Sequence, residues 1–209
     1  MGFEYGHGGP SHYALEDIGA LRTFPGLTVV IPADSGQTTT ALQKTSDLPG
    51  PVYYSLGKDD KTFVPGLDGR FELGRVQVVT SGADIAIVTM GSIAPEAVAA
   101  ATSLASRGIQ ATVIVVSNFN PDPEKDLVEI LAQFRHVISL EAQTISGGLG
   151  ACVGMQIAEH GLDCRLHPLA VRVSPDGTTG SPADRWRKYS LDRVSIVNAA
   201  LAALGVAPA

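Results

Sequence analysis

Residues 84–117, DIAIVTMGSIAPEAVAAATSLASRGIQATVIVVS, decide the fold of this 209-residue chain. Apolar runs of strand length open and close the stretch, at Asp84–Met90 and at Gln110–Ser117. The Ala-rich segment between them, Pro95–Arg107, predicts a helix, because Pro suits a first helical turn and Gly108 follows where helices commonly end. A strand, a helix and a second strand of these lengths predict a βαβ unit with parallel strands.

The same alternation continues toward the C-terminus. Further strands are expected at His136–Glu141 and Arg165–Val173. Further helices are expected at Pro123–Phe134, Leu149–His160 and Ser190–Leu204. The last helix should pack through Val194, Val197, Leu201 and Leu204. Together these elements predict a mostly parallel sheet covered by helices on both faces, a three-layer α/β/α domain.

The first third of the chain predicts an incomplete unit. After a turn-rich loop at Met1–Ser11, the pattern predicts two helices and two strands: a helix Tyr13–Arg22 capped by Ser11, a strand Leu27–Ile31, a helix from Ser35 to Gln43 and a strand Val52–Leu56. Two strands alone are marginal, so we expect these to pair with strands outside residues 1–209. We place the boundary near Gly74–Ser81, which gives domains at 1–74 and 75–209.

Composition excludes several classes of protein. The chain is 44% hydrophobic with a formal net charge of −6, which argues against a nucleic-acid-binding surface. No apolar run approaches the roughly 20 residues of a membrane span, and no secretory signal opens the chain. Cys152 and Cys164 fit neither a disulfide framework nor a zinc site, so we expect buried free thiols and a cytoplasmic protein.

The densest group of chemically useful residues lies in Tyr5–His12, YGHGGPSH. Glycines let the backbone approach a ligand closely, and His7 and His12 could exchange protons with a substrate oxygen near neutral pH. A structural turn carrying two exposed histidines explains the same pattern. A metal site is less favoured, because no third ligand is near.

The segment Gly6–Asp17, GHGGPSHYALED, resembles the substrate-loop motif of transketolases. The resemblance continues at Phe24–Asp34, Gly50–Leu56, Asp84–Ser92 and Glu141–Gly150. It is closest to the C-terminal subunit of split transketolases. The fold that this implies is a partial thiamine-diphosphate pyrimidine-binding domain followed by a mostly parallel α/β/α C-terminal domain.

The resemblance also implies roles for individual residues. His12 matches the histidine that contacts the reacting end of the donor, so it is the expected catalytic residue. Lys58 falls where transketolases commonly carry a phosphate-binding arginine, and an exposed connector lysine is the alternative. His7, Gly8 and Ser11 are the other expected substrate-binding positions. Many transketolases have Asp in place of Gly8, so the glycine should leave room for a different donor.

The implied activity is transfer of a two-carbon ketol unit between sugars or sugar phosphates, with thiamine diphosphate and Mg²⁺ as cofactors. The activating glutamate, the stacking aromatics and the Gly-Asp-Gly motif of the family are missing from residues 1–209. We therefore expect elements outside this chain to hold most of the cofactor, and no metal to be bound by this chain itself. The expected partner is a pyrophosphate-domain subunit, in a dimer of heterodimers.

Other functions remain open. A 1-deoxyxylulose-5-phosphate synthase and the β subunit of a 2-oxo acid dehydrogenase are the nearest enzyme alternatives, although Tyr13–Asp17 fits transketolase better. The remaining alternative is a non-catalytic assembly module.

Two further motifs have structural interpretations. Gly147–Gly150 could form a phosphate loop, but tight packing of a helix on a strand is the favoured interpretation. Arg185–Tyr189, which contains Trp186, is expected to be a solvated loop.

Overall fold

A five-stranded sheet forms the centre of the larger unit in the computed structural model, which describes residues 2–207. Its strands, in the order β3-β5-β4-β7-β8, are β5 (Ala111–Val116) and β4 (Ile85–Thr89) at the centre, with β3 (Val76–Thr80), β7 (His136–Thr144) and β8 (Arg165–Val171) around them. β4, β5, β7 and β8 are parallel, whereas β3 runs antiparallel to β5. The predicted mostly parallel sheet is confirmed. The predicted boundary segment Gly74–Ser81 contains the strand β3.

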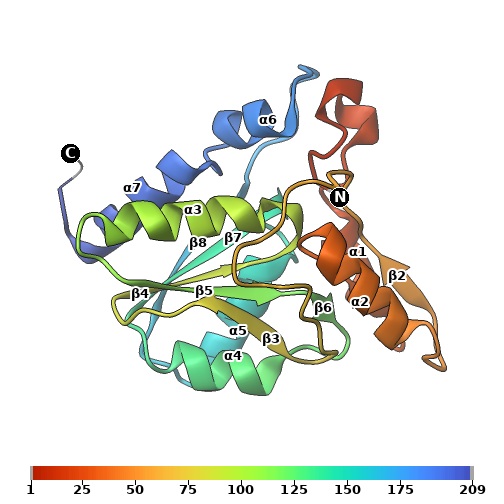
Figure 1. Ribbon diagram of the computed structural model, residues 1–209, viewed down its shortest axis with the longest axis horizontal. Helices are drawn as coiled ribbons and strands as arrows, with labels where there is room; N and C mark the ends of the chain where they lie inside the picture. The colour runs from red at the N-terminus through yellow and green to blue at the C-terminus, as the bar shows by residue number, and fades with distance from the viewer. Residues whose placement is uncertain (1, 208–209) are drawn as a thin grey trace.

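Helices cover both faces of this sheet (Figure 1). The helices α3 (Ala94–Ala105) and α7 (Arg193–Leu204) pack on one face, and α4 (Glu124–Leu131) and α5 (Leu149–Glu159) pack on the other. The strand β4 shows the reason for its continuous apolar run. Ile85 and Ile87 enter one core cluster while Ala86 and Val88 enter the other, and all four are fully buried.

A second, three-stranded sheet belongs to the smaller unit. Its order is β2 (Val52–Tyr54), β1 (Thr28–Val30) and β6 (Asn118–Phe119), and α1 (Asp17–Leu21) and α2 (Ser35–Thr45) are its helices. The expectation that Leu27–Ile31 pairs only outside the chain is wrong. β6, which follows β5 directly, pairs antiparallel with β1 and supplies the missing neighbour.

The N-terminal segment lies across the carboxyl ends of the parallel strands. Phe3 is 1% exposed and belongs to the core of the larger unit, while Gly2 lies against Ala142 near the end of β7. The amide of Thr144, the last residue of β7, donates to the carbonyl of Leu15. Ligands usually bind at this edge of a parallel sheet. The fold therefore places the glycine loop where function is expected.

The predicted helix Tyr13–Arg22 with Ser11 as its cap is wrong. Tyr13 is extended, and Ala14 forms an isolated antiparallel bridge with Gly2. The helix α1 begins only at Asp17, while Ser11 lies inside a short 3₁₀ helix. Pairing with the N-terminal segment holds this stretch extended, which the helical spacing of its apolar residues does not reveal.

The predicted solvated loop at Arg185–Tyr189 is also wrong. The helix α6 (Pro182–Lys188) begins with a capping box in which Ser181 and Asp184 satisfy each other's backbone amides. The side chain of Arg185 is largely buried and donates to the carbonyl of Thr178.

Three smaller expectations concern burial. Val194 is 57% exposed, so it does not belong to the packing face of α7, which begins after the cap Asp192. Ile196 takes its place in the core. Cys152 is buried as expected, whereas Cys164 is only partly buried.

Candidate functional site

The glycine loop forms two short 3₁₀ helices, η1 (Gly6–Gly8) and η2 (Pro10–His12). Gly9 joins them with a φ of +75°, a conformation that favours glycine. The loop rests on the segment before α6. The amide of Gly180 donates to the carbonyl of Gly6 at 3.2 Å, and the Tyr13 hydroxyl donates to the carbonyl of Thr178 at 3.1 Å. A Cβ on Gly6 would lie 2.3 Å from the Gly180 carbonyl oxygen, so glycine is required at this contact.

An aromatic stack ties the base of the loop to α6. The rings of Phe3 and Tyr189 are stacked with centroids 5.0 Å apart, and Tyr13 meets Phe3 edge-on at the same distance. These contacts join the smaller unit to the last third of the chain. They fix the base of the loop, while its tip is exposed.

His12 lies at the exposed end of η2. Its Nδ1 is 3.1 Å from the carbonyl oxygen of Gly8 and 3.0 Å from Oγ of Ser11. Because a carbonyl can only accept a hydrogen bond, the contact with Gly8 requires a proton on Nδ1. That tautomer leaves Nε2 free to accept a proton or a hydrogen bond from a ligand.

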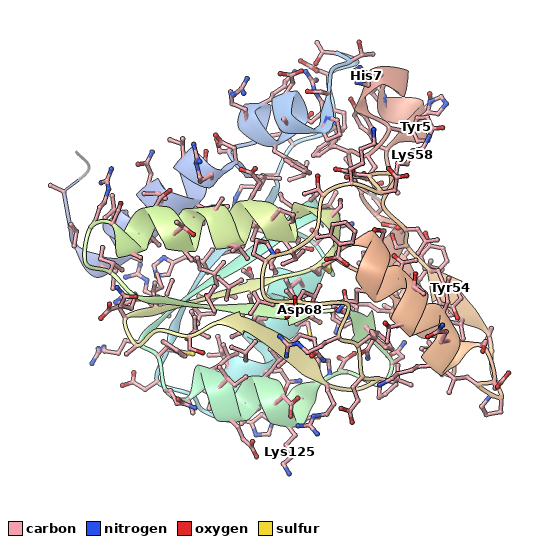
Figure 2. The ribbon with its side chains drawn as sticks, in the orientation of Figure 1. Tyr5, His7, Tyr54, Lys58, Asp68 and Lys125 are labelled. Atoms are coloured by element: carbon pink, nitrogen blue, oxygen red, sulfur yellow. The ribbon has the colours of Figure 1, made fainter. Side chains whose placement is uncertain are left out.

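Lys58 lies beside the same loop, although 46 positions separate it from His12 in the sequence. Its Nζ is 3.5 Å from the ring centroid of Tyr5, and the Tyr5 ring is 5.7 Å from the imidazole of His12. The backbone amide of Lys58 donates to Oε2 of Glu4 at 3.0 Å. Figure 2 shows Tyr5, His7 and Lys58 at the same end of the molecule.

The structure thus brings together four of the five predicted site residues. His12, Ser11 and Gly8 touch one another, and Lys58 joins them through Tyr5. His7 is exposed on η1 within the same loop. Tyr5 and Glu4 are the residues that sequence reasoning missed. Their one signal is their position directly before the glycine loop.

The expectation that Gly8 leaves room for a different donor is wrong. A Cβ on Gly8 would lie 2.8 Å from Cγ and 2.9 Å from Nδ1 of His12. The imidazole of His12 itself occupies the space in front of the glycine. Gly8 therefore controls where the ring of His12 lies.

Replacing Gly8 with alanine should displace this ring, break its contact with the Gly8 carbonyl and lower transfer activity at least about tenfold. The melting temperature should not change, because both residues are exposed. Gly154→Ala in α5 is the matched control, since its new Cβ meets no atom closer than 3.5 Å. Wild-type activity of Gly8→Ala would show that the ring position does not matter.

A cavity of about 320 Å³ lies behind the loop, between the two units. Glu4 and Asp59, the sequence neighbours of Tyr5 and Lys58, line it together with Pro95 at the start of α3 and Trp186 of α6. His12 does not line this cavity and faces open surface instead. The surfaces that surround a ligand at His12 are therefore only partly present among residues 2–207.

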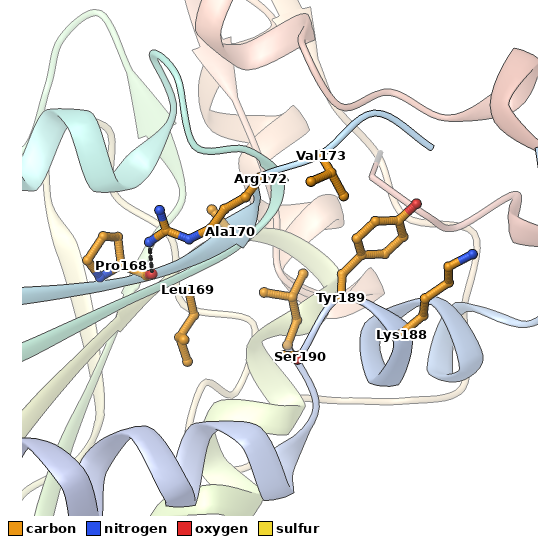
Figure 3. A pocket seen from close by; sticks show the side chains of 9 residues that line it. Pro168, Leu169, Ala170, Arg172, Val173, Lys188, Tyr189 and Ser190 are labelled. Carbon is orange, nitrogen blue, oxygen red and sulfur yellow. Dashed lines mark hydrogen bonds between the residues drawn. The ribbon is translucent and has the colours of Figure 1, made fainter. Parts of the chain in front are cut away.

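A second cavity, of about 270 Å³, lies between β8 and the end of α6 (Figure 3). Its two basic residues are already engaged. Arg172 donates to the carbonyl of Pro168, and Lys188 pairs with Asp176. This arrangement does not leave either cation free for an anionic ligand.

The described residues do not fit a diphosphate-bound metal ion. Across residues 2–207 there is no group of three or more His, Cys, Asp or Glu side chains that could hold one. Diphosphate sites of this kind need Mg²⁺ held by oxygen ligands. Residues 2–207 thus offer part of a substrate site and no complete metal site.

The run Gly147–Gly150 packs α5 against β7. A Cβ on Gly148 would lie 1.9 Å from Oε2 of Glu141. The carboxylate of Glu141 accepts from the amides of Leu149 and Gly150, both at 2.9 Å, and so fills the N-terminus of α5 where a phosphate would bind. The packing interpretation of these glycines agrees with this geometry.

Burial raises the pKa of Glu141 to about 7, against the opposing effect of its two hydrogen bonds. The folded chain therefore binds this proton more tightly than the unfolded chain does. Between about pH 4.5 and 7 the group should lower the free energy of unfolding by an amount on the order of 3 kcal/mol, with no further loss at higher pH.

Chemical unfolding of wild type and Glu141→Gln across pH 4–8 measures this effect. The difference in unfolding free energy between the two proteins should change over that window and then level off. A constant difference would mean that Glu141 does not titrate there.

No helix within residues 2–207 is long and apolar enough to cross a membrane.

Comparison with known proteins identifies both units. Residues 74–196 match the model of the transketolase C-terminal domain, and residues 1–61 match that of the transketolase pyrimidine-binding domain. One of the subunits of apulose-4-phosphate transketolase is 30% identical over 200 residues in Actinobacillus succinogenes and 32% identical over 208 residues in Phocaeicola vulgatus. Each match covers 96% of this chain and 64% of the relative, so the chain spans under two thirds of their length.

A solved structure agrees with these matches. A split-gene transketolase, described as an inactive β4 tetramer, superposes with a TM-score of 0.83 at 32% identity, covering 94% of this chain and 63% of the other. The match to the C-terminal domain alone spans more than half of the chain. The chain therefore belongs to the transketolase family, in which it resembles the C-terminal subunit of split transketolases.

Proposed function

We propose that this chain is the substrate-loop and C-terminal part of a thiamine-diphosphate-dependent transketolase that works with a second subunit. The reaction is transfer of a two-carbon ketol unit between sugars, at least one of them phosphorylated. The observation that carries the proposal is the placement of His12 and Lys58 against one ring, Tyr5, on a loop fixed by the core. Residues 1–74 and 75–209 act as its two domains.

Two side chains of this chain would contact the substrate. Nε2 of His12 accepts or returns a proton at the oxygens of the reacting carbons, which is general acid–base catalysis. The ammonium of Lys58 binds a phosphate as a point charge, without the two-pronged geometry of an arginine. Ser11 and Gly8 hold the imidazole, and His7 stands at the outer side of the loop.

Cofactor and partner complete the proposal. Thiamine diphosphate supplies carbanion chemistry when it is bound. Since the described residues do not offer a metal cluster, the diphosphate and its Mg²⁺ would be held outside residues 1–209, by a pyrophosphate-domain subunit. The two apulose-4-phosphate transketolase relatives are single subunits of their enzyme, which supports such a partner, and the sugar phosphate in their name supports an anionic substrate. A dimer of heterodimers in the cytoplasm, where both free thiols stay reduced, is the assembly we propose.

Reconstitution tests the proposal. The chain is mixed with a candidate pyrophosphate-domain subunit, thiamine diphosphate and Mg²⁺, and ketol transfer is assayed with a panel of ketose and aldose phosphates. Transfer should appear only in the complete mixture. A complex that binds the cofactor but transfers no ketol unit to any aldose would favour the assembly module or one of the other thiamine enzymes.

A further inference from the structure

The ring of Tyr5 is an aromatic side chain with no place in the core. It is 48% exposed, yet it contacts two of the proposed substrate-binding groups. The Lys58 ammonium lies 3.5 Å from its centroid, and the His12 imidazole lies 5.7 Å away. An exposed aromatic ring in this position is explained by what it holds.

Glu4, the residue before Tyr5, fixes the backbone of Lys58 through a hydrogen bond from its amide at 3.0 Å. Two consecutive residues of the N-terminal segment thus hold both ends of Lys58. Because η1 and η2 follow directly, the position of Lys58 is tied to the loop that carries His12.

The ring attracts the ammonium without neutralising it. Within residues 2–207 Lys58 forms no ion pair with a carboxylate. A ring holds a cation through its quadrupole, whereas the oxygens of a phosphate form stronger, charge-assisted hydrogen bonds. A phosphate that enters beside the loop can therefore take the ammonium from the ring.

From this geometry we infer that Tyr5 is a positioning residue, which holds the Lys58 ammonium next to His12 until a substrate phosphate takes it. The inference rests on the proposed function and deepens it. It assigns the substrate class as short sugar phosphates whose anionic end lies opposite the reacting carbons, because both groups flank a single ring.

Kinetics of the chain in complex with its partner subunit provide the first test. Tyr5→Leu removes the ring and should raise KM for ribose 5-phosphate as acceptor about two- to fivefold, the weight of an exposed cation–π contact. Its kcat and its KM for unphosphorylated ribose should not change. Tyr5→Phe keeps the ring and should match wild type. A drop in kcat with both acceptors, or equal effects in the two variants, would overturn the inference.

A second test does not depend on activity. Protons above an aromatic ring resonate upfield, so the ε-methylene protons of Lys58 should be shifted in wild type and in Tyr5→Phe, but not in Tyr5→Leu. Lys58→Met identifies the resonance by removing it. Inorganic phosphate should return the shifted resonance toward its ordinary position.

The two tests separate the inference from the proposed function. If the complex transfers nothing to any acceptor, the proposed function fails and the spectra still decide the role of Tyr5. Identical Lys58 resonances in wild type and Tyr5→Leu, or no response to phosphate, would refute the role of Tyr5 whatever the activity.

Discussion

Replacing His12 with alanine should lower ketol transfer by the assembled enzyme about 10²–10⁴-fold, the usual loss when one acid–base group is removed. The imidazole is exposed at the end of η2, and only Ser11 and Gly8 hydrogen-bond to it. The fold should therefore survive the change. Steady-state kinetics together with a thermal melt of the variant measure both effects.

His160→Ala is the matched control for this experiment. His160 is also a surface histidine, but it pairs with Glu124 on the opposite side of the larger unit. Its loss should leave transfer activity at the wild-type level. Activity of His12→Ala within a factor of two of wild type would remove His12 from the catalytic mechanism.

Replacing Arg22 with alanine should destabilise the chain by about 3–5 kcal/mol, the usual cost of leaving one charge of a buried pair without its partner. Nη2 of Arg22 lies 3.2 Å from Oδ2 of Asp122, and these side chains are only 13% and 23% exposed. Arg22 also donates to the carbonyl of Gly147 and lies over the ring of Phe119. One side chain therefore joins α1, β6 and the start of α5.

Urea unfolding measures this loss, and Lys125→Ala is the control. Lys125 and Glu129 also form an ion pair, but at 4.0 Å and with side chains 86% and 64% exposed, so its removal should cost less than about 0.5 kcal/mol. A loss of about 1 kcal/mol or less in Arg22→Ala would mean that this contact does not hold the two units together.

The larger unit was predictable because its strands are continuous apolar runs. β4 and β5 are buried on both faces, so their sequence needs no alternation and stands out from the helices around them. The helix α6 was also readable, since Ser181, Pro182 and Asp184 form a helix-start signal. The charged residues that follow obscured it.

The pairing of β1 could not be predicted in the same way. β6 contains only two residues, and Asn118 lies 88 positions after its partner Val30, so no local pattern announces the contact. The extended stretch before α1 has the same cause. Its partner is the N-terminal segment, and tertiary pairing overrides helical spacing.

The candidate site divides along the same line. The motif around His12 is local and was found from the sequence. The approach of Lys58 to Tyr5 depends on how the loop docks, and the tight contact between Gly8 and the imidazole depends on the shape of η1 and η2. Neither could follow from residue types alone.

The central claim is that residues 1–209 supply the substrate loop while the cofactor site is completed outside them. Calorimetric titration with thiamine diphosphate and Mg²⁺, first of this chain alone and then of its mixture with the partner subunit, tests it most directly. We predict no saturable binding by the chain alone and saturable, magnesium-dependent binding by the mixture. Saturable, magnesium-dependent binding of thiamine diphosphate by residues 1–209 alone would contradict it.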